Sequence, residues 1–155
     1  MDIRFAKRED TPAILRLLQQ VGQVHHLARP DIFREGAQKY GASQVLSLID
    51  KPGVAILIAA EEERVLGYCF CFLKTYEKDP VLCDRKELYI DDLCVDENCR
   101  RGGIGKALYE AACRYARESY CHSVTLNVWC DNEDALHFYE SLGMGRQKIK
   151  MENIL

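Results

Sequence analysis

The sequence predicts a mixed α/β fold in which antiparallel strands come first and a strand–helix–strand unit follows. Three observations predict it. The middle of the chain holds consecutive apolar, strand-like segments, the strongest helical pattern comes directly after them, and a further strand-like segment and helix follow. Because 155 residues are too few for two ordinary domains, we expect a single domain over residues 1–155.

Local signals mark one strand and two helices in the N-terminal third. Thr11 and Pro12 supply an N-cap and a first-turn proline, and apolar residues then follow at helical spacing until Arg29-Pro30. Ser43 can cap a second helix, and Lys51-Pro52-Gly53 can end it. The expected elements are a strand over 2–6, a helix from Thr11, a loop over 31–40 with room for a short helix, and a helix over 43–49.

The middle of the chain is rich in strand-forming residues. Val54–Ala60 and Val65–Glu77 are apolar and aromatic runs separated by a short polar turn, which predicts an antiparallel hairpin. Asp79-Pro80 opens a loop, and Lys86–Asp96 is the next expected strand.

Helix and strand alternate in the C-terminal half. Apolar residues between Ile104 and Tyr115 follow the i, i+3, i+4, i+7 spacing without a miss, which predicts a strongly amphipathic helix. The elements expected after it are a strand over 123–128, a helix that Asp131 caps and Gly143 ends, and a last strand over 144–153.

Composition and charge exclude several classes of protein. Hydrophobic residues make up 48% of the chain and charged residues 29%, which disfavours intrinsic disorder. The formal net charge of −3 gives no basic field for nucleic acid. The longest apolar run, Val54 to Ala60, is far shorter than the roughly 20 residues of a membrane helix. No apolar segment follows the charged start of the chain, so we expect no signal peptide, no membrane contact and a cytoplasmic protein.

The eight cysteines are the unusual feature of the composition. No Cys-x-x-Cys occurs, and no Cys/His spacing is typical of a zinc site. In a cytoplasmic protein the thiols stay reduced, so we interpret most of them as small packing residues, with no metal bound. A redox or zinc-binding thiol protein is the alternative, and it depends on the cysteine count alone.

A glycine-rich loop connects the strand that ends near Asp96 to the helix that begins at Ile104. The segment reads DENCRRGGIGKAL, and its three glycines and three cations predict an anion site at the start of a helix. It is no Walker loop, because Arg100 stands where the first glycine belongs and Ala107 follows the lysine. The dinucleotide fingerprint fails at Leu108. A plain glycine turn with solvated arginines is the alternative.

Two motifs carry a resemblance to a known family. Arg100-Arg101-Gly102-Gly103-Ile104-Gly105 resembles the R/Q-x-x-G-x-G/A pattern of the GNAT superfamily of N-acetyltransferases. Asn132 to Gly143 resembles that family's closing motif, N-x-x-A-x-x-F-Y-x-x-x-G, without gaps. The resemblance is close over residues 86–143 and elsewhere covers only the order of elements. It implies the GNAT fold, a central mixed and mostly antiparallel sheet flanked by helices, with acetyl-CoA as co-substrate and no metal.

The resemblance also implies a cofactor site. In the family, loop amides bind the pyrophosphate of acetyl-CoA, and a splayed strand pairs with its pantetheine arm. Cys94 would act through its backbone amide, which faces the thioester oxygen, and Tyr139 would protonate the departing thiolate. From helical spacing alone, Tyr139 would instead be a core residue. The implied cofactor-binding residues are Leu93, Cys94, Val95, Arg100, Arg101, Gly102, Gly103, Ile104, Gly105, Lys106, Asn132 and Tyr139.

The residues that would deprotonate and bind the acceptor amine are less defined. Glu87, Asp91 and Asp92 lie on the strand before the acetyl site, and strand alternation puts the two aspartates on opposite faces unless a bulge intervenes. A base acting through ordered water is common in the family, and solvated surface carboxylates are the plain alternative. His26, at the end of the first helix, is a further candidate for acceptor binding, although a histidine is also favoured there by the helix dipole.

The expected reaction is direct transfer of the acetyl group of acetyl-CoA to a primary amine of a small acceptor, with no acyl-enzyme. The strand LYIDDLCV also resembles that of diamine and polyamine acetyltransferases, and its acids would suit a cationic amine. Alternatives are a protein N-terminus or lysine as acceptor, and an acetyl-CoA-binding module without catalysis. An exposed C-terminal strand, Arg146–Asn153, could pair across a homodimer.

Overall fold

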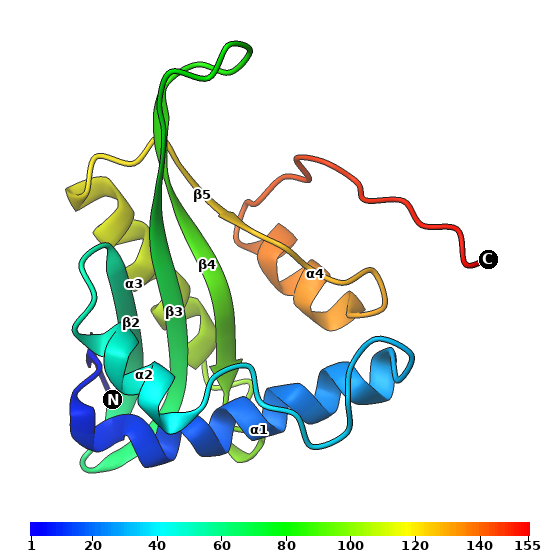
Figure 1. Cartoon of the computed structure of the whole chain (residues 1–155). Helices are drawn as coiled ribbons and strands as arrows, with labels where there is room; N and C mark the ends of the chain where they lie inside the picture. The colour runs from blue at the N-terminus through cyan, green and yellow to red at the C-terminus, as the bar shows by residue number, and fades with distance from the viewer.

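The computed structural model describes all 155 residues, and its strands form one five-stranded sheet in the order β1-β2-β3-β4-β5 (Figure 1). Helices flank this sheet, so the predicted mixed α/β architecture is confirmed. The elements are β1 (Asp2–Phe5), η1 (Arg8–Asp10), α1 (Thr11–Ala28), α2 (Ala42–Ile49), β2 (Val54–Glu61), β3 (Arg64–Tyr76), β4 (Arg85–Val95), η2 (Glu97–Cys99), α3 (Ile104–Glu118), β5 (Ser123–Leu126) and α4 (Glu133–Ser141).

The sheet is antiparallel from β1 to β4 and parallel only between β4 and β5. Short turns join β2 to β3, as expected of a hairpin, whereas α3 supplies the crossover that parallel neighbours need. The 31–40 segment holds no helix and forms turns and bends. The strands and helices expected from the sequence up to Ser141 are all present, with their ends shifted by a few positions.

Each face of the sheet is covered by a different set of helices (Figure 1). On one face, α1 and α2 pack their apolar residues on Ile58, Tyr68 and Phe70. On the other face, α3 packs Leu108 and Ala112 on Cys69, Leu88 and Ile90 together with their neighbours. This alternation follows from the two-residue period of the strands, because successive side chains point to opposite faces.

β4 and β5 diverge before β4 ends. Their parallel pairing covers only Glu87–Ile90 and Ser123–Leu126, whereas β4 continues to Val95. Figure 1 shows the two strands diverging, with α4 lying beyond the end of β5. The last part of β4 therefore pairs with β3 alone, and its other edge has no strand partner.

Asp96 fixes the point at which β4 ends and the glycine loop begins. Its buried carboxylate accepts hydrogen bonds from Arg16 of α1 at 2.8 Å and from the backbone amide of Asn98 at 3.1 Å. Burial opposes ionisation of this carboxyl, but the hydrogen bonds from Arg16 and Asn98 outweigh it and hold its pKa at about 2. The ion pair thereby ties α1 to the start of the loop.

We expect Asp96→Asn to lower the free energy of unfolding by up to about 2 kcal/mol at pH 7, because its carboxyl pKa rises on unfolding to roughly 4. Arg16 is 47% exposed, so solvent screening keeps the loss at or below this figure. A depressed pKa gives stability that is complete above about pH 4 and is lost as the pH falls towards 2.

Urea denaturation of the wild type and the variant measures this effect. Asp50→Asn is the matched control, because Asp50 is an exposed carboxylate paired with the exposed Arg8. The control should change the free energy of unfolding by less than about 0.5 kcal/mol. Equal losses in the two variants would show that burial of the Asp96 pair adds nothing.

The predicted last strand is wrong. Residues 144–155 form no regular structure and run away from the sheet beyond α4 (Figure 1). A strand needs a neighbour to hydrogen-bond with. No strand of the chain lies beside this segment, which is instead tied down by an ion pair between Glu152 and Arg29 at 2.6 Å. The apolar side chains of Ile149 and Met151 stay exposed.

Two smaller expectations also need correction. α4 is capped by Asn132 rather than Asp131, because the Asn132 side chain accepts the hydrogen bond from the Ala135 amide at 3.2 Å.

The interpretation of the cysteines as packing thiols holds for Cys69, Cys71 and Cys94 but is wrong for Cys83 and Cys130, which are exposed. No helix has both the length and the apolar character needed to cross a bilayer.

Candidate active site

A β-bulge brings both aspartates of β4 to the same side of the sheet. Phe70 of β3 is in register with Asp92, and Cys71 is in register with Ile90, so Asp91 is left without a partner. The extra residue reverses the alternation of faces from that point on. Asp92 consequently faces α1 rather than sharing the α3 face with Ile90. The bulge lies where β4 leaves β5.

Asp91 is held by two side chains of the segment between α1 and α2. Its carboxylate accepts a hydrogen bond from the Tyr40 hydroxyl at 2.6 Å and lies 2.8 Å from the Lys39 ammonium. The same ammonium donates to the backbone carbonyl of Asp91 at 2.9 Å. The bulge thus already holds one primary ammonium group, that of Lys39.

Asp92 lies in a less polar environment. Burial raises the pKa of its carboxyl, whereas the hydrogen bond from the Tyr68 hydroxyl at 2.7 Å favours the ionised form. His25 lies close enough to sense this charge, yet burial lowers its pKa below the usual value, so its imidazole is neutral at pH 7. The pKa of Asp92 is therefore raised and that of His25 is lowered, and both groups lie on the same side of the sheet, near the point where β4 and β5 diverge.

The glycine loop gives α3 an open N-terminus. Gly103 is the N-cap and has a φ of 77°, in the left-handed region where glycine is free of strain. A Cβ added there would meet nothing within 4 Å, so the first turn of α3 is open to an incoming group. The next glycine, Gly105, allows α3 to lie close to α4, because its Cβ would come within 3.2 Å of Phe138.

The cationic side chains of the loop are exposed. The Arg100 guanidinium reaches the carbonyl of Val95 at 3.5 Å, and Lys106 forms a long ion pair of 3.9 Å with Glu110. Arg101 adopts a φ of 65°. The loop therefore offers backbone amides at a helix N-terminus, with exposed positive charge around them, which is an arrangement suited to phosphate.

The unpaired edge of β4 adjoins this loop. Leu93 and Val95 turn their side chains to the α3 core, whereas Cys94 turns its own to the α1 core. The Cys94 thiol lies 3.6 Å from the Leu17 carbonyl, and burial raises its pKa to about 12. The thiol thus keeps its proton at neutral pH and points away from this edge. The Asp96 amide donates to the Leu66 carbonyl of β3, so by alternation the Cys94 amide also faces β3, contrary to expectation, and the amides of Leu93 and Val95 face the open edge.

Tyr139 and Asn132 lie across the gap on α4. Tyr139 is half-buried, with its ring centroid 5.0 Å from that of Phe138 and 6.2 Å from that of Tyr109. Burial raises the pKa of its phenol well above the usual value, and the nearby Cys69 and Asp92 add to the effect. The phenol therefore keeps its proton at neutral pH. Asn132 uses its side-chain oxygen to cap α4, which leaves its amide nitrogen for other contacts.

Two predicted acceptor residues lie apart from this group. Glu87 is buried and accepts a hydrogen bond from Tyr76 at 2.8 Å, roughly 13 Å along the strand from Asp91. The His26 ring nitrogen lies 2.8 Å from the carbonyl of Phe33, so this side chain fixes the 31–40 segment. The structure groups Asp91 and Asp92 and leaves Glu87 and His26 in other contacts.

Sequence reasoning missed several residues that surround the aspartates. Lys39, Tyr40 and Tyr68 contact them directly, and no local pattern marks any of these residues. His25 stacks on Phe33, whose ring meets Trp129 edge-on with a centroid distance of 5.2 Å. This aromatic row joins α1, the 31–40 segment and the chain after β5. The end of α1 carries two adjacent histidines, of which only His26 was named from the sequence.

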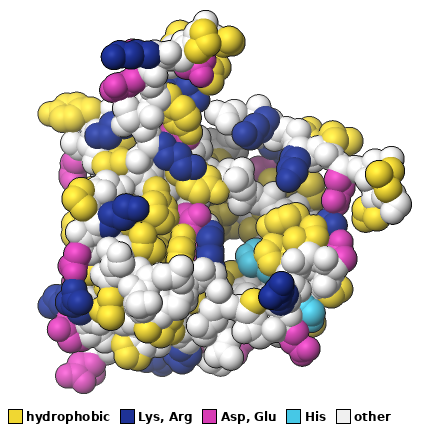
Figure 2. Space-filling model, viewed as in Figure 1, with side chains coloured by type: hydrophobic (Ala, Val, Ile, Leu, Met, Phe, Trp, Pro, Cys, Tyr) yellow, Lys and Arg dark blue, Asp and Glu magenta, His cyan; other side chains and the backbone are white.

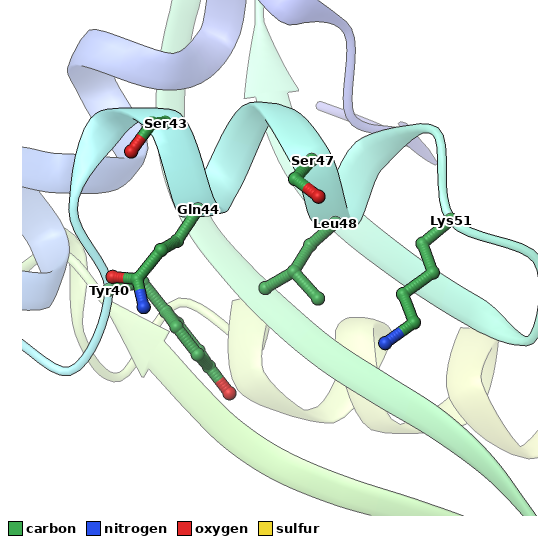
Figure 3. A pocket seen from close by; sticks show the side chains of 6 residues that line it. All are labelled: Tyr40, Ser43, Gln44, Ser47, Leu48 and Lys51. Atoms are coloured by element: carbon green, nitrogen blue, oxygen red, sulfur yellow. The ribbon is translucent and has the colours of Figure 1, made fainter.

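The surface of the molecule is hollowed between β4 and α4. Figure 2 shows an opening there, with a basic side chain on one side and a histidine on the other. A separate cavity of about 280 Å³ lies on α2 (Figure 3). Figure 3 shows Leu48 between Tyr40 at one end and Lys51 at the other. Of the residues that line this cavity, only Tyr40 contacts one of the aspartates. We therefore place the candidate active site at the opening between β4 and α4 and not in this cavity.

Residues 19–144 match the model of the Acetyltransferase (GNAT) family. The chain is similar to N-alpha-acetyltransferase 30 of Mus musculus, with 30% identity over 145 residues, 91% of this chain and 38% of that protein. It thus spans about two fifths of the length of that relative. Over 63 residues it is 36% identical to glucosamine 6-phosphate N-acetyltransferase of Trypanosoma brucei brucei, which is 41% of each chain.

Among solved structures, the fold is similar to that of the tetramutant of the BH1408 protein of Bacillus halodurans. The TM-score is 0.95 at 35% sequence identity, and the match covers 100% of both chains.

Proposed function

The chain belongs to the GNAT acetyltransferase family, and we propose that it transfers the acetyl group of acetyl-CoA directly to a primary amine of a small, cationic acceptor. One observation carries the proposal. The edge of β4 over Leu93–Val95 has no strand partner, and it lies between the open N-terminus of α3 and the bulge that holds two aspartates.

The residues present fit acetyl-CoA. The free backbone edge of Leu93–Val95 can pair with the amides of the pantetheine arm, as an added strand would. The first amides of α3 and the open space at Gly103 can receive the pyrophosphate. Supplying an activated acetyl group is the part of the chemistry that acetyl-CoA contributes. Binding, orientation and proton transfer are left to the chain.

Protein side chains then divide the proton transfers between the two sides of the opening. In our proposal, Asp91 binds the acceptor ammonium, and Asp92 takes a proton from it directly or through water. The amide of Leu93, which faces the open edge, donates a hydrogen bond to the oxygen that becomes negative as the amine adds. Tyr139 gives its phenolic proton to the sulfur that leaves. The neutral His25 is a second proton acceptor close to Asp92.

Similarity to N-alpha-acetyltransferase 30 favours a second candidate acceptor, the N-terminus of a protein. The two candidates differ in what must reach the bulge. A peptide needs a groove for its backbone, whereas a small amine needs only the acids. Initial rates with polyamines, amino sugars and short peptides at equal concentration separate them. We expect the cationic small amines to react fastest, and preference for peptides would replace our proposal with the second candidate.

Acetyl-CoA binding can be tested before any acceptor is known. At a concentration of roughly 100 times its Kd, a ligand that binds only the folded state adds about 2.7 kcal/mol to its stability. A thermal melt should therefore shift upward with acetyl-CoA and not with acetate. No shift at millimolar acetyl-CoA would contradict both the enzyme and a non-catalytic acetyl-CoA-binding module.

Gly103→Ala should weaken acetyl-CoA binding by about tenfold, because the methyl group enters the space at the first turn of α3. Gly36→Ala is the matched control, since Gly36 also has a positive φ of 67° and open space around it. Both variants should lose about 1–2 kcal/mol of stability through backbone strain. Isothermal titration should find weaker acetyl-CoA binding only in Gly103→Ala, and equal affinities would remove Gly103 from the site.

We further propose that the chain forms a homodimer through residues 146–153. This segment exposes Ile149 and Met151 on alternate positions, and the outer edge of β5 has no strand beside it. Light scattering should give a dimer for the wild type and a monomer for Ile149→Lys combined with Met151→Lys. Lys148→Gln combined with Lys150→Gln is the control and should remain dimeric. A monomeric wild type would end this proposal.

A further inference from the structure

Lys39 places a primary amine of the chain itself at the aspartates of the bulge. Its ammonium lies 2.8 Å from the Asp91 carboxylate and 2.9 Å from the Asp91 carbonyl. The nitrogen is therefore in contact with both the side chain and the backbone of β4. It occupies the position that an acceptor ammonium takes in the proposed reaction.

The same nitrogen lies within reach of the proposed thioester position. Leu93 is two residues beyond Asp91, which is roughly 7 Å along a strand. A lysine stem has four methylene groups and can move its amine by several ångströms. The side chain of Lys39 is 45% exposed, so it is not confined by packing. His25 and Asp92 both sense its charge, which places it on the side of the opening where protons would be removed.

Other lysines make contacts away from the bulge. Lys74 lies over the Tyr89 ring at 3.4 Å, Lys86 donates to the Ser119 carbonyl at 2.9 Å, and Lys106 pairs with Glu110. None of these partners is one of the two aspartates. Lys39 is thus distinguished from them by its environment and not by exposure.

We propose that the enzyme acetylates its own Lys39 at Nζ, an inference that rests on the proposed acetyltransferase activity. The neutral amine attacks the thioester carbonyl, so that an N–C bond forms and the C–S bond breaks. The ammonium first gives one proton to water, which produces the neutral amine. The second proton leaves nitrogen as the amide forms and goes to the Asp92 carboxylate, while the CoA sulfur receives a proton from Tyr139. The products are Nζ-acetyl-Lys39 and CoA. The modification removes the cation paired with Asp91 and leaves that acid to attract a cationic acceptor.

The test is to incubate the full chain with isotopically labelled acetyl-CoA, without added amine, and to measure label at each lysine by peptide mass spectrometry. Lys51 is the internal control, because it is an exposed lysine at the end of α2 and not at the bulge. We expect Lys39 to be labelled at least about tenfold faster than Lys51, because a tethered amine reacts at high effective concentration. The rate constant should not depend on protein concentration.

Tyr139→Phe separates the enzymatic reaction from spontaneous acetylation. It should slow labelling of Lys39 and leave Lys51 unchanged. Equal rates at Lys39 and Lys51, or no effect of Tyr139→Phe on Lys39, would overturn the inference. If external amines are turned over while Lys39 stays unlabelled, the inference fails and the proposed function stands. Absence of any melting shift with acetyl-CoA would instead mean that the proposed function itself has failed.

Discussion

Tyr139→Phe is expected to lower kcat by about 10²- to 10³-fold, with acetyl-CoA affinity nearly unchanged. The phenol is the group on α4 that can supply a proton at the gap between β4 and α4. Its pKa is raised by burial and by the nearby Cys69 and Asp92, so it stays protonated at neutral pH until a strong base, such as a departing thiolate, is formed. Phenylalanine keeps the ring and its packing on Phe138 but removes the proton.

Tyr109→Phe is the matched control for this variant. Tyr109 lies on α3, and its ring centroid is 6.2 Å from that of Tyr139, so the two rings share an environment. Pre-steady-state and steady-state rates of CoA release, together with acetyl-CoA titrations, should leave Tyr109→Phe close to wild type. Unchanged turnover in Tyr139→Phe would remove this residue from the mechanism, and a matching fall in acetyl-CoA affinity would make its role one of binding.

Asp92→Asn is expected to lower kcat by about 10²-fold, because a general base typically contributes 10²- to 10⁴-fold and water can replace part of its role. The wild-type rate should rise with pH through the raised pKa of Asp92, since only the ionised carboxylate accepts a proton. This acidic limb should disappear in Asp92→Asn. Circular dichroism and a thermal melt establish that the variant is folded.

Tyr68→Phe gives a second readout that a purely structural role would not produce. The Tyr68 hydroxyl donates a hydrogen bond of 2.7 Å to Asp92 and lowers the pKa of that carboxyl. Loss of this hydrogen bond should therefore raise the pKa and move the acidic limb to higher pH. An unshifted limb, together with an unchanged limb in Asp92→Asn, would assign the titration to another group, with the neutral His25 as the next candidate.

Local signals in the sequence were sufficient for most of the fold. Thr11-Pro12 and the regular spacing from Ile104 onward depend only on neighbouring residues, and α1 and α3 begin where these signals lie. The prediction of a last strand over 144–153 was wrong because it also used only local signals. Ile149 and Met151 alternate as strand residues do, but a strand also needs a partner, and alternation says nothing about whether one is available.

The candidate site was predictable only where it follows a motif or a run along one strand. Asp91 and Asp92 could be named, but whether they share a face depends on the register between β3 and β4, which is set by pairing across the sheet. Lys39 lies 52 positions from Asp91 in the sequence, so no local pattern connects them. Glu87 was named because it is an acid on the same strand as the aspartates, but it accepts a hydrogen bond from Tyr76 of β3 and lies away from the bulge.

The central claim is that acetyl groups pass from acetyl-CoA to a small cationic amine at the opening between β4 and α4. Its most direct test is to incubate the protein with acetyl-CoA and a panel of polyamines, amino sugars and peptides, and to measure CoA release and the mass of each amine. We predict amine-dependent release of CoA, in equal amount to an N-acetylated small amine, with the rate lost in Tyr139→Phe. Firm binding of acetyl-CoA with no acetylated product from any amine or peptide would contradict this account and identify a binding module instead.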